Sequence, residues 1–335
     1  MRILVHPGLT NGPGMLRVVT GALAEQGNEV VPWEQHRQSG DPFDIVYLHF
    51  AARHFLEPGE RLHPGNAPAT APEFLESVRT LRHEGAKVVL HVHDRVPHVW
   101  LGAVETWDQR MEPLHRMVDG VVHMTQASLD MHRETLLGEL PSVVVPFPSF
   151  ELVPRPAAGR SSGVLPRLVL IGRMVPRKHF VAACTELLTN SDLRAVVGGE
   201  PAVDRIAADL RSLAALYPER LEVLAHRLAD QEITGLFSQP SVALLNQPSL
   251  LNSGVMMTAL CHGAPVIAPD TPVTREHRER FGAEWIRLFQ PPLQGAELQR
   301  LAEMSLPHGF PDLSANDPTL TAAAIGAFMS GIARR

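Results

Sequence analysis

A segment near the middle of the chain gathers residue types suited to binding an anion. The apolar run Leu168–Ile171 ends at Gly172, and Arg173 and Lys178 follow within six positions. Glycine lets a ligand approach the backbone closely. The planar guanidinium of Arg173 can pair with two phosphate oxygens, and Lys178 supplies a compact point charge. The spacing predicts a phosphate-binding loop; a solvated basic loop after a strand is the alternative.

Lys178 stands out because arginine supplies almost all of the positive charge. Of the 30 basic residues, only Lys87 and Lys178 are lysines. A lysine kept among arginines indicates a position that needs an ammonium instead of a guanidinium, with sequence drift as the alternative.

A second polar stretch leads into a predicted helix start. Asn252 or Ser253 would cap a helix over Val255–Leu260. The N–H groups and the positive dipole end of a helix start attract anions, and Gly254 permits a close approach. A plain helix cap is the alternative.

The 17 histidines raise the question of a metal site, above all His91, His93 and His98, with His49 and His54 earlier in the chain. Alternate residues of a strand share one face. Zinc, however, needs three or four converging ligands, and no further Cys or His pair has helical ligand spacing. We therefore predict no metal site, and we interpret His93 as a cleft residue at the end of a strand, with a buried core histidine as the alternative.

Strands that alternate with helices must position these residues. In the first half, β-branched runs predict strands at Arg2–His6, Glu29–Trp33, Asp44–Phe50, Lys87–His93, Gly120–His123 and Ser142–Pro146, with helices over Met15–Gln26, Pro72–Glu84, Val104–Val118 and Ala127–Leu137. The pattern restarts with strands at Arg167–Ile171, Leu193–Val197, Leu221–Leu224, Val242–Leu245, Pro265–Ala268 and Ile286–Phe289, and it ends in a helix over Leu320–Ile332. This alternation predicts two doubly wound parallel sheets with a ligand cleft at the carboxyl ends of their strands.

The length and the breaker residues predict how the chain is divided. A chain of 335 residues exceeds the roughly 100–200 residues usual for one domain. We predict an N-terminal domain over 1–153, a linker rich in Pro, Gly and Ser over 154–163, and a C-terminal domain over 164–316. The remaining helix, 317–335, is expected to pack back toward the N-terminal domain.

Composition excludes several classes of function. The net charge of −6 is spread along the chain, which disfavours a nucleic-acid partner. No apolar stretch reaches the roughly 18 residues of a membrane span, and the first residues run directly into a strand instead of a signal peptide. We therefore expect a cytoplasmic protein for which peripheral membrane contact remains open. Cys184 and Cys261 stand in no motif and are expected to be buried side chains.

Several motifs, in order, resemble those of the GT-B glycosyltransferases related to glycogen and sucrose-phosphate synthases. They are Gly172–Lys178, Val196–Pro201, Ala229–Ile233 and Cys261–Ala268, which together span most of residues 167–270. The segments Arg95–His98 and Pro146–Ser149 are nearer to relatives that build bacterial exopolysaccharides. The resemblance implies an α/β fold of two Rossmann-like domains facing a cleft. Residues 1–153 would then bind the acceptor, and residues 164–316 would bind a nucleoside diphosphate sugar, without any cofactor.

The resemblance also implies roles for particular residues. Arg173 and Lys178 would hold the donor diphosphate, joined by the helix start at Asn252, Ser253 and Gly254. The nucleotide would lie against Gly172, Gly198, Gly199, Arg227, Leu228 and Thr258. The loop with Gly12 and Gly14 would lie near the acceptor or sugar, and His93 with Asp94 would be catalytic, positioning the sugar or, in an inverting variant, taking the acceptor's proton.

The chain departs from the family at two positions. Relatives carry two glutamates eight residues apart before the glycine-proline element, where this chain has Leu250 and Thr258. Retention or inversion at the sugar therefore stays open, as do the donor's base and sugar and the oligomeric state. We expect metal-independent transfer to the hydroxyl of a glycan, a lipid-linked saccharide or a small natural product. The alternatives are a catalytically silent GT-B partner subunit and a GT-B sugar-nucleotide epimerase.

Overall fold

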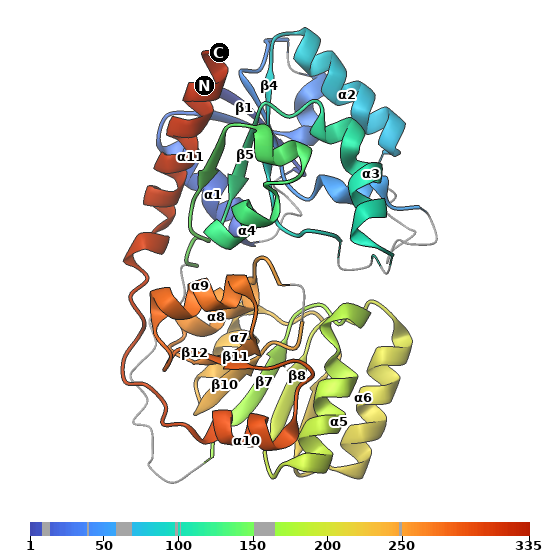
Figure 1. Ribbon diagram of the computed structural model, residues 1–335, viewed down its shortest axis with the longest axis vertical. Helices are drawn as coiled ribbons and strands as arrows, with labels where there is room; N and C mark the ends of the chain where they lie inside the picture. Colours follow the sequence, from blue (N-terminus) through green and yellow to red (C-terminus); the bar gives the residue numbers. More distant parts are fainter. Residues whose placement is uncertain are drawn as a thin grey trace. The chain divides into compact units, whose positions relative to one another are not determined.

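The computed structural model describes residues 1–8, 14–38, 40–57, 69–97, 100, 102–150, 165–247 and 250–335. The chain divides into two compact units (Figure 1). Unit 1 comprises Met1–Phe150 and Ser314–Arg335, and unit 2 comprises Glu151–Leu313. The segment predicted as a linker, 154–163, lies outside the described residues. Within the described residues, no helix has both the length and the apolar character needed to cross a membrane.

Unit 1 is built on a six-stranded parallel sheet in the order β2-β1-β3-β4-β5-β6. Its strands are β1 (Arg2–His6), β2 (Glu29–Pro32), β3 (Ile45–Leu48), β4 (Lys87–His91), β5 (Gly120–His123) and β6 (Ser142–Val144). The central strands are buried along almost their whole length, because a parallel sheet is covered on both faces. The strand order reverses between β1 and β3, which makes their carboxyl ends the switch point of the sheet.

Unit 1 also contains α-helices and short 3₁₀ helices, most of which connect the strands of this sheet. The α-helices are α1 (Gly14–Glu25), α2 (Ala71–His83), α3 (Val104–His115), α4 (Gln126–Met131) and α11 (Pro318–Ala333). The 3₁₀ helices are η2 (Trp33–Gln38), η3 (Ala51–Phe55), η6 (Leu136–Glu139) and η8 (Ser314–Asn316). The predicted single helix over Ala127–Leu137 is wrong. The helix ends at Met131, because the N–H groups of His132 and Thr135 close short turns onto Leu129 and His132.

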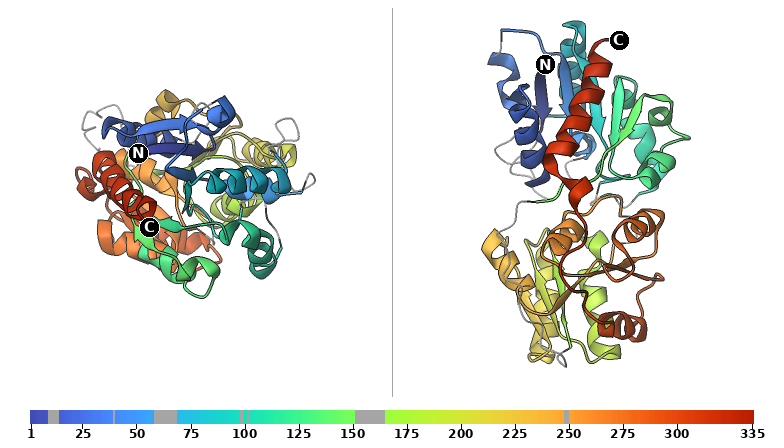
Figure 2. Two further views of the ribbon diagram at one scale, coloured as in Figure 1. Left: turned by 90° about the horizontal axis from the view of Figure 1, so that it is seen from above. Right: turned by 90° about the vertical axis from the view of Figure 1, so that its left-hand side faces the viewer.

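The C-terminal helix α11 belongs to unit 1, although unit 2 separates it from the rest of that unit in sequence. It lies along α1 and also contacts β4 and β5, as the two views of the red helix show (Figures 1 and 2). A Cβ atom at Gly120 of β5 would lie 2.9 Å from Cζ of Phe328 and 3.0 Å from Cδ1 of Ile332. The absence of a side chain at Gly120 therefore allows the helix to approach the sheet closely.

Unit 2 repeats the architecture with the strand order β12-β11-β10-β7-β8-β9. Its strands are β7 (Arg167–Ile171), β8 (Ala195–Gly198), β9 (Leu221–Leu224), β10 (Ser241–Leu244), β11 (Val266–Pro269) and β12 (Ile286–Phe289). Its α-helices are α5 (Phe180–Asn190), α6 (Asp204–Leu216), α7 (Asp230–Phe237), α8 (Gly254–Cys261), α9 (Pro272–Phe281) and α10 (Gly295–Glu303). Two doubly wound parallel sheets confirm the predicted α/β fold class. The switch point of this sheet lies between β7 and β10.

The packing of α11 generates a test of stability. Ile325 is fully buried on this helix, whereas Leu320 is 60% exposed. We expect Ile325→Ala to lower the free energy of unfolding by about 2–4 kcal/mol, because it leaves a cavity in the core of unit 1. Leu320→Ala, the matched control, should change it by less than about 0.5 kcal/mol in urea unfolding. Equal effects of the two substitutions would contradict the packing described for α11.

Candidate functional site

The switch point of unit 2 brings together the two segments that sequence analysis assigned to anion binding. In open parallel sheets, ligands bind at the carboxyl ends of the strands, where the strand order reverses. The loop that carries Gly172, Arg173 and Lys178 follows β7, and the segment that leads into α8 follows β10. Because β7 and β10 are paired neighbours, both segments lie at the same point of the sheet edge.

The ammonium of Lys178 lies directly beside Gly172. The φ angle of Gly172 is 112°, in the region that favours glycine, and a Cβ atom there would lie 2.9 Å from Nζ of Lys178. The same atom would lie 3.3 Å from Cγ2 of Val255, the second residue of α8. The lysine and the start of α8 therefore meet beside one glycine, and Arg173, the next residue, is exposed.

A short 3₁₀ helix, η7 (Pro176–Lys178), holds Lys178 in this place. The backbone N–H of Lys178 donates to the carbonyl of Val175 over 3.1 Å. His179 then adopts a left-handed conformation, with φ of 51°, before α5 begins. The lysine is thus fixed by a turn and not by a flexible loop.

The start of α8 fits both interpretations made from the sequence, a helix cap and an anion-binding helix start. Ser253 caps the helix, since its Oγ accepts a hydrogen bond from the N–H of Met256 over 3.1 Å. This cap satisfies one N–H group, whereas those of Gly254 and Val255 have no acceptor within the helix itself. Their orientation suits an anion beyond the helix end. Asn252, one residue earlier, is half-buried.

Gly198 and Gly199 hold the ends of β7 and β8 at very close range. A Cβ atom at Gly199, whose φ is 151°, would lie 1.9 Å from the carbonyl oxygen of Gly172. A Cβ atom at Gly198 would lie 2.7 Å from Cδ1 of Leu228. The structure therefore brings Gly172, Gly198, Gly199 and Leu228 together, and Arg227 is exposed beside Leu228 in the chain.

The two positions where the family has glutamates differ in their surroundings. Leu250 is only 5% exposed and belongs to the core, so its position cannot serve a ligand. Thr258 is half-buried, one helical turn after Gly254 on α8, and its hydroxyl stays on the same helix face as the helix start.

A carboxylate that sequence analysis did not assign lies close to Leu228. The side chain of Glu232 accepts hydrogen bonds from the N–H of Ala229 and from Nε2 of His226, both over 2.8 Å. These bonds, the backbone one first, lower the pKa of Glu232. The spacing of Ala229 and Glu232, three residues apart at a helix start, was the available signal.

Another hollow in unit 2 does not coincide with these residues. A cavity of about 390 Å³ is lined by Asp270, Arg275, Arg278, Glu279, Ala283 and Leu288. The carboxylate of Asp270 there is already bonded to Arg275 over 2.5 Å and to Gln290 over 2.6 Å. Its charge is matched within the protein, and we do not assign it to the site.

In unit 1, His93 lies two residues beyond the end of β4, which is shorter than predicted. Its ring is 8% exposed and is stacked between Phe50 and His91, with centroid distances of 3.9 and 4.7 Å. Asp94, the next residue, is half-buried. Gly14 is the first residue of α1, and Gly12 lies outside the described residues.

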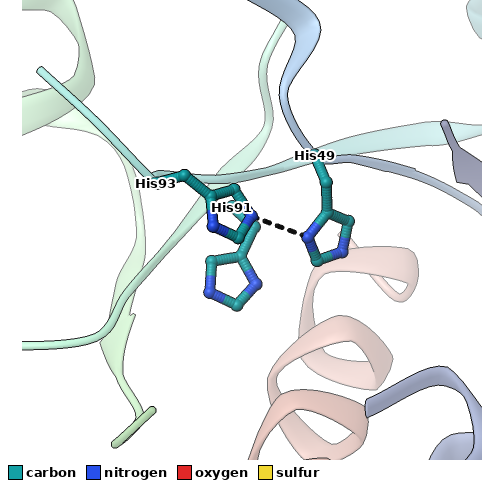
Figure 3. A group of neighbouring side chains, drawn as sticks. All are labelled: His49, His91 and His93. Atoms are coloured by element: carbon teal, nitrogen blue, oxygen red, sulfur yellow. Dashed lines mark hydrogen bonds between the residues drawn. The ribbon is translucent and has the colours of Figure 1, made fainter. Parts of the chain in front are cut away.

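His49, His91 and His93 form a buried group at the ends of β3 and β4 (Figure 3). One ring nitrogen of each lies within 4.8 Å of one from each of the others. Nδ1 of His49 is 2.9 Å from Nε2 of His93, and Nδ1 of His91 is 2.5 Å from the hydroxyl of Tyr47. Burial lowers the pKa of all three, that of His93 to about 3, so the rings are neutral.

The hydrogen bond between His49 and His93 limits what this group can bind. In an N–H···N bond between neutral imidazoles, the accepting ring carries its own proton on the other nitrogen. Only the donating ring then keeps a lone pair, so the group offers at most two ligands, from His91 and from one of the bonded pair. Zinc sites need three or four. The arrangement therefore does not fit a zinc ion while this bond is in place.

The direction of that bond follows from the second nitrogen of His49. Nε2 of His49 is buried and has no hydrogen-bond partner among the described residues. A buried N–H without an acceptor is rarer and costlier than a lone pair without a donor. His49 therefore carries its proton on Nδ1 and donates to His93, which carries its own proton on Nδ1. Nε2 of His93 is thus occupied and is not available as a base.

The glycine contacts in unit 2 predict opposite changes in the free energy of unfolding for two Gly→Ala substitutions. Gly199→Ala should lower the free energy of unfolding by about 2–4 kcal/mol, because the new Cβ would strain the backbone and collide with the Gly172 carbonyl. Gly235→Ala, in the exposed interior of α7 where a Cβ meets nothing within 4 Å, should raise it by about 0.5–1 kcal/mol. Urea unfolding measures both, and a neutral Gly199→Ala would contradict the close approach of β7 and β8.

No family model matches the sequence, and no match is found among curated proteins. Solved structures do match. HepE from Anabaena in complex with UDP-glucose is 13% identical, with 99% of this chain and 97% of that chain covered and a TM-score of 0.59. The lipopolysaccharide outer core galactosyltransferase WaaB, in its apo form, is 11% identical, with 99% of each chain covered and a TM-score of 0.61. Sucrose-phosphate synthase from Thermosynechococcus elongatus is 14% identical, with 99% of this chain and 96% of that chain covered and a TM-score of 0.58.

At these identities the likenesses show the fold. The chain is similar over nearly its whole length to proteins built from two doubly wound α/β units, and its own two parallel sheets match that description. The chain has the GT-B fold.

Proposed function

We propose that the protein transfers a sugar from a nucleoside diphosphate sugar to an acceptor hydroxyl. Unit 2 binds the donor and unit 1 the acceptor. The observation that carries this proposal is the Lys178 ammonium beside Gly172 and the start of α8, at the switch point of unit 2. Support also comes from the complex of HepE with UDP-glucose, whose fold this chain shares.

In such a transfer, the barrier depends on negative charge that develops on the departing diphosphate. Lys178 and Arg173 supply two cations, and the N–H groups of Gly254 and Val255 supply two dipoles. Fixed donors of this kind stabilise a leaving group more effectively than solvent does, because they need no reorganisation. With these four groups in place, no divalent ion is required at the diphosphate.

The nucleoside is assigned to the glycine-rich ends of β7 and β8. Gly172, Gly198 and Gly199 present backbone instead of side chains, and the protein itself fills the volume that their Cβ atoms would take. Leu228, which packs against Gly198, adds an apolar contact. Arg227 and Thr258 flank this surface with one cation and one hydroxyl. The missing glutamates leave the donor contacts to backbone, cations and Thr258.

The proposed acceptor side of the reaction involves His93 and Asp94. Because His49 donates to Nε2 of His93, this nitrogen cannot take a proton, and we assign His93 the role of positioning the sugar. Asp94 is the group that would accept the acceptor's proton in an inverting transfer. The acceptor itself is a glycan, a lipid-linked saccharide or a small natural product.

A silent partner subunit is the second candidate, and one observation favours it. Leu250 lies in the core and Thr258 has no charge, so neither carboxylate function of the relatives can operate at these two positions. An epimerase would also need carboxylates for proton transfer, and these positions provide none. A panel of UDP-, ADP- and GDP-sugars, assayed for transfer, hydrolysis and epimerised product, separates the three activities.

Lys178 provides the sharpest test of the donor site. Lys178→Ala should lower the affinity for the nucleoside diphosphate and the transfer rate by about 10- to 150-fold, because it removes a charge-assisted contact worth about 1.5–3 kcal/mol. Lys178→Arg should recover little of this loss, since a planar guanidinium does not fit where a compact ammonium lies beside Gly172. Isothermal titration with UDP, ADP and GDP and initial-rate kinetics measure both effects.

Lys87→Arg is the matched control for that series. Lys87 is the other lysine of the chain and begins β4 in unit 1, so its replacement should leave nucleotide affinity and rate unchanged. Near-normal affinity and turnover in a folded Lys178→Ala protein would remove the basis of the donor site. The silent-partner candidate would then become the better one.

The cationic diphosphate site also predicts the response to divalent ions. We expect the transfer rate to survive EDTA and to gain nothing from added magnesium or manganese, because two side-chain cations and a helix start replace the ion. Initial rates with and without chelator measure this. A rate abolished by EDTA and restored by either ion would show that an oxygen-ligated metal belongs to the site.

A further inference from the structure

Two more buried histidines, which the proposed function does not use, form a pair at the switch point of unit 1. His6 ends β1 and is 2% exposed, and His54 lies in η3 and is 5% exposed. Their Nε2 atoms are 2.8 Å apart, which is hydrogen-bond distance. One proton must therefore lie between these two nitrogens.

The outer nitrogens of the pair both face carbonyl oxygens. Nδ1 of His6 is 3.1 Å from the carbonyl oxygen of His49, and Nδ1 of His54 is 2.7 Å from that of Ala69. A carbonyl oxygen can only accept, so each Nδ1 must carry a proton. With the proton between the Nε2 atoms, the arrangement needs three ring protons. Two neutral imidazoles supply two.

We propose that His6 and His54 share three ring protons at neutral pH, so that the pair carries one positive charge and acts as a pH-sensitive clamp. The three hydrogen bonds tie together four segments: the end of β1, the residue after β3, the helix η3 and the residue before the cap of α2. These segments border the switch point of unit 1, where open α/β sheets bind their ligands.

The charge belongs to His54. Its ring is stacked on Phe74 with centroids 4.1 Å apart and planes 5° apart, and an aromatic face attracts a cation. Burial first, then His54 and Arg53, lower the pKa of His6 to about 3, so His6 does not take a second proton. His54 therefore donates from both nitrogens, to Ala69 and to the lone pair on Nε2 of His6.

The charged neighbours come from the helices packed around the pair. Arg53, beside His54 on η3, opposes a second cation, but burial lowers the pKa of Arg53 itself. Glu34 on η2 attracts cations here and raises the pKa of Arg53, and its carboxylate also accepts from the N–H of Gly8 over 3.2 Å. Glu73 on α2 is bonded to the backbone and hydroxyl of Thr70.

Three further titratable groups, on η2 and β3 and directly after β3, complete the surroundings of the pair. His36 on η2 is bonded through Nδ1 to the carbonyl of Trp33, over 2.6 Å. Tyr47 on β3 stays protonated because burial raises its pKa, and burial holds the pKa of His49 well below its ordinary value. Neither Tyr47 nor His49 adds a charge that competes with His54.

The sign of the pH effect follows from proton linkage. If the pair holds the third proton at neutral pH, its folded pKa lies above the roughly 6.5 of an unfolded histidine. Its contribution to stability is then fully present below about pH 6.5 and is lost as the pH rises through the folded pKa. Above that value two lone pairs would face each other across 2.8 Å, so the clamp opens.

Nitrogen NMR of the intact protein, with ¹⁵N-labelled histidine, tests the proton count directly. At neutral pH we expect both ring nitrogens of His54 to be protonated, and His6 to be protonated on Nδ1 alone. Spectra of His54→Gln and His6→Gln assign the signals. A bare nitrogen on His54 at neutral pH would overturn the proposal. Through-bond correlations in the wild-type protein, from each imidazole to its own backbone, give the same assignment if a variant fails to fold.

Unfolding equilibria from about pH 5 to about pH 9 test the clamp. The advantage of the wild type over His54→Gln should shrink as the pH rises above 7, by about tenfold in the folding constant per unit that the folded pKa exceeds 6.5. His277→Gln in unit 2 is the matched control with the opposite sign, because burial lowers the pKa of His277 to about 4. If the His54→Gln difference grew with pH as the control does, the pair would be neutral and the proposal wrong.

Discussion

The parallel pairing of the strands is the constraint on which the rest of the structure depends. Every pairing among the described strands is parallel, so all strands of a unit end at one edge of its sheet. Loops far apart in sequence must therefore meet there. Gly172 and Val255 meet beside Lys178 for this reason, and so do the histidines at the ends of β1, β3 and β4.

At the carboxyl ends of the strands of unit 2, the candidate anion site is formed mainly by backbone groups and not by side chains. The carbonyl of Gly172 occupies the volume that a side chain at Gly199 would need, and Lys178 and Val255 occupy the volume beside Gly172. Packing this close leaves backbone N–H groups and one ammonium facing the same point. A site of this construction suits a compact anion and does not need the carboxylates that Leu250 and Thr258 fail to provide.

The sequence predicts the fold better than it predicts the site. The strands Arg2–His6, Arg167–Ile171 and Ile286–Phe289 are observed with their predicted bounds, because buried parallel strands are mostly apolar runs with few competing patterns. Partners set by strand register are invisible in the sequence. The ring of His49 meets that of His93 because β3 and β4 pair through Leu48 and Leu90, and no local pattern encodes that register. Burial of Leu250 is likewise a property of the packed core.

The histidines of unit 1 are joined through one residue. The carbonyl of His49 accepts from Nδ1 of His6, and its ring donates to Nε2 of His93. His49 thus lies between the His6–His54 pair, which we propose to be charged, and the ring of His93, which burial keeps neutral. The residue that accepts from His6 through its backbone is thus the same residue that fixes the tautomer of His93 through its ring. His49 therefore joins the buried pair to the candidate catalytic histidine, with its carbonyl on one side and its ring on the other.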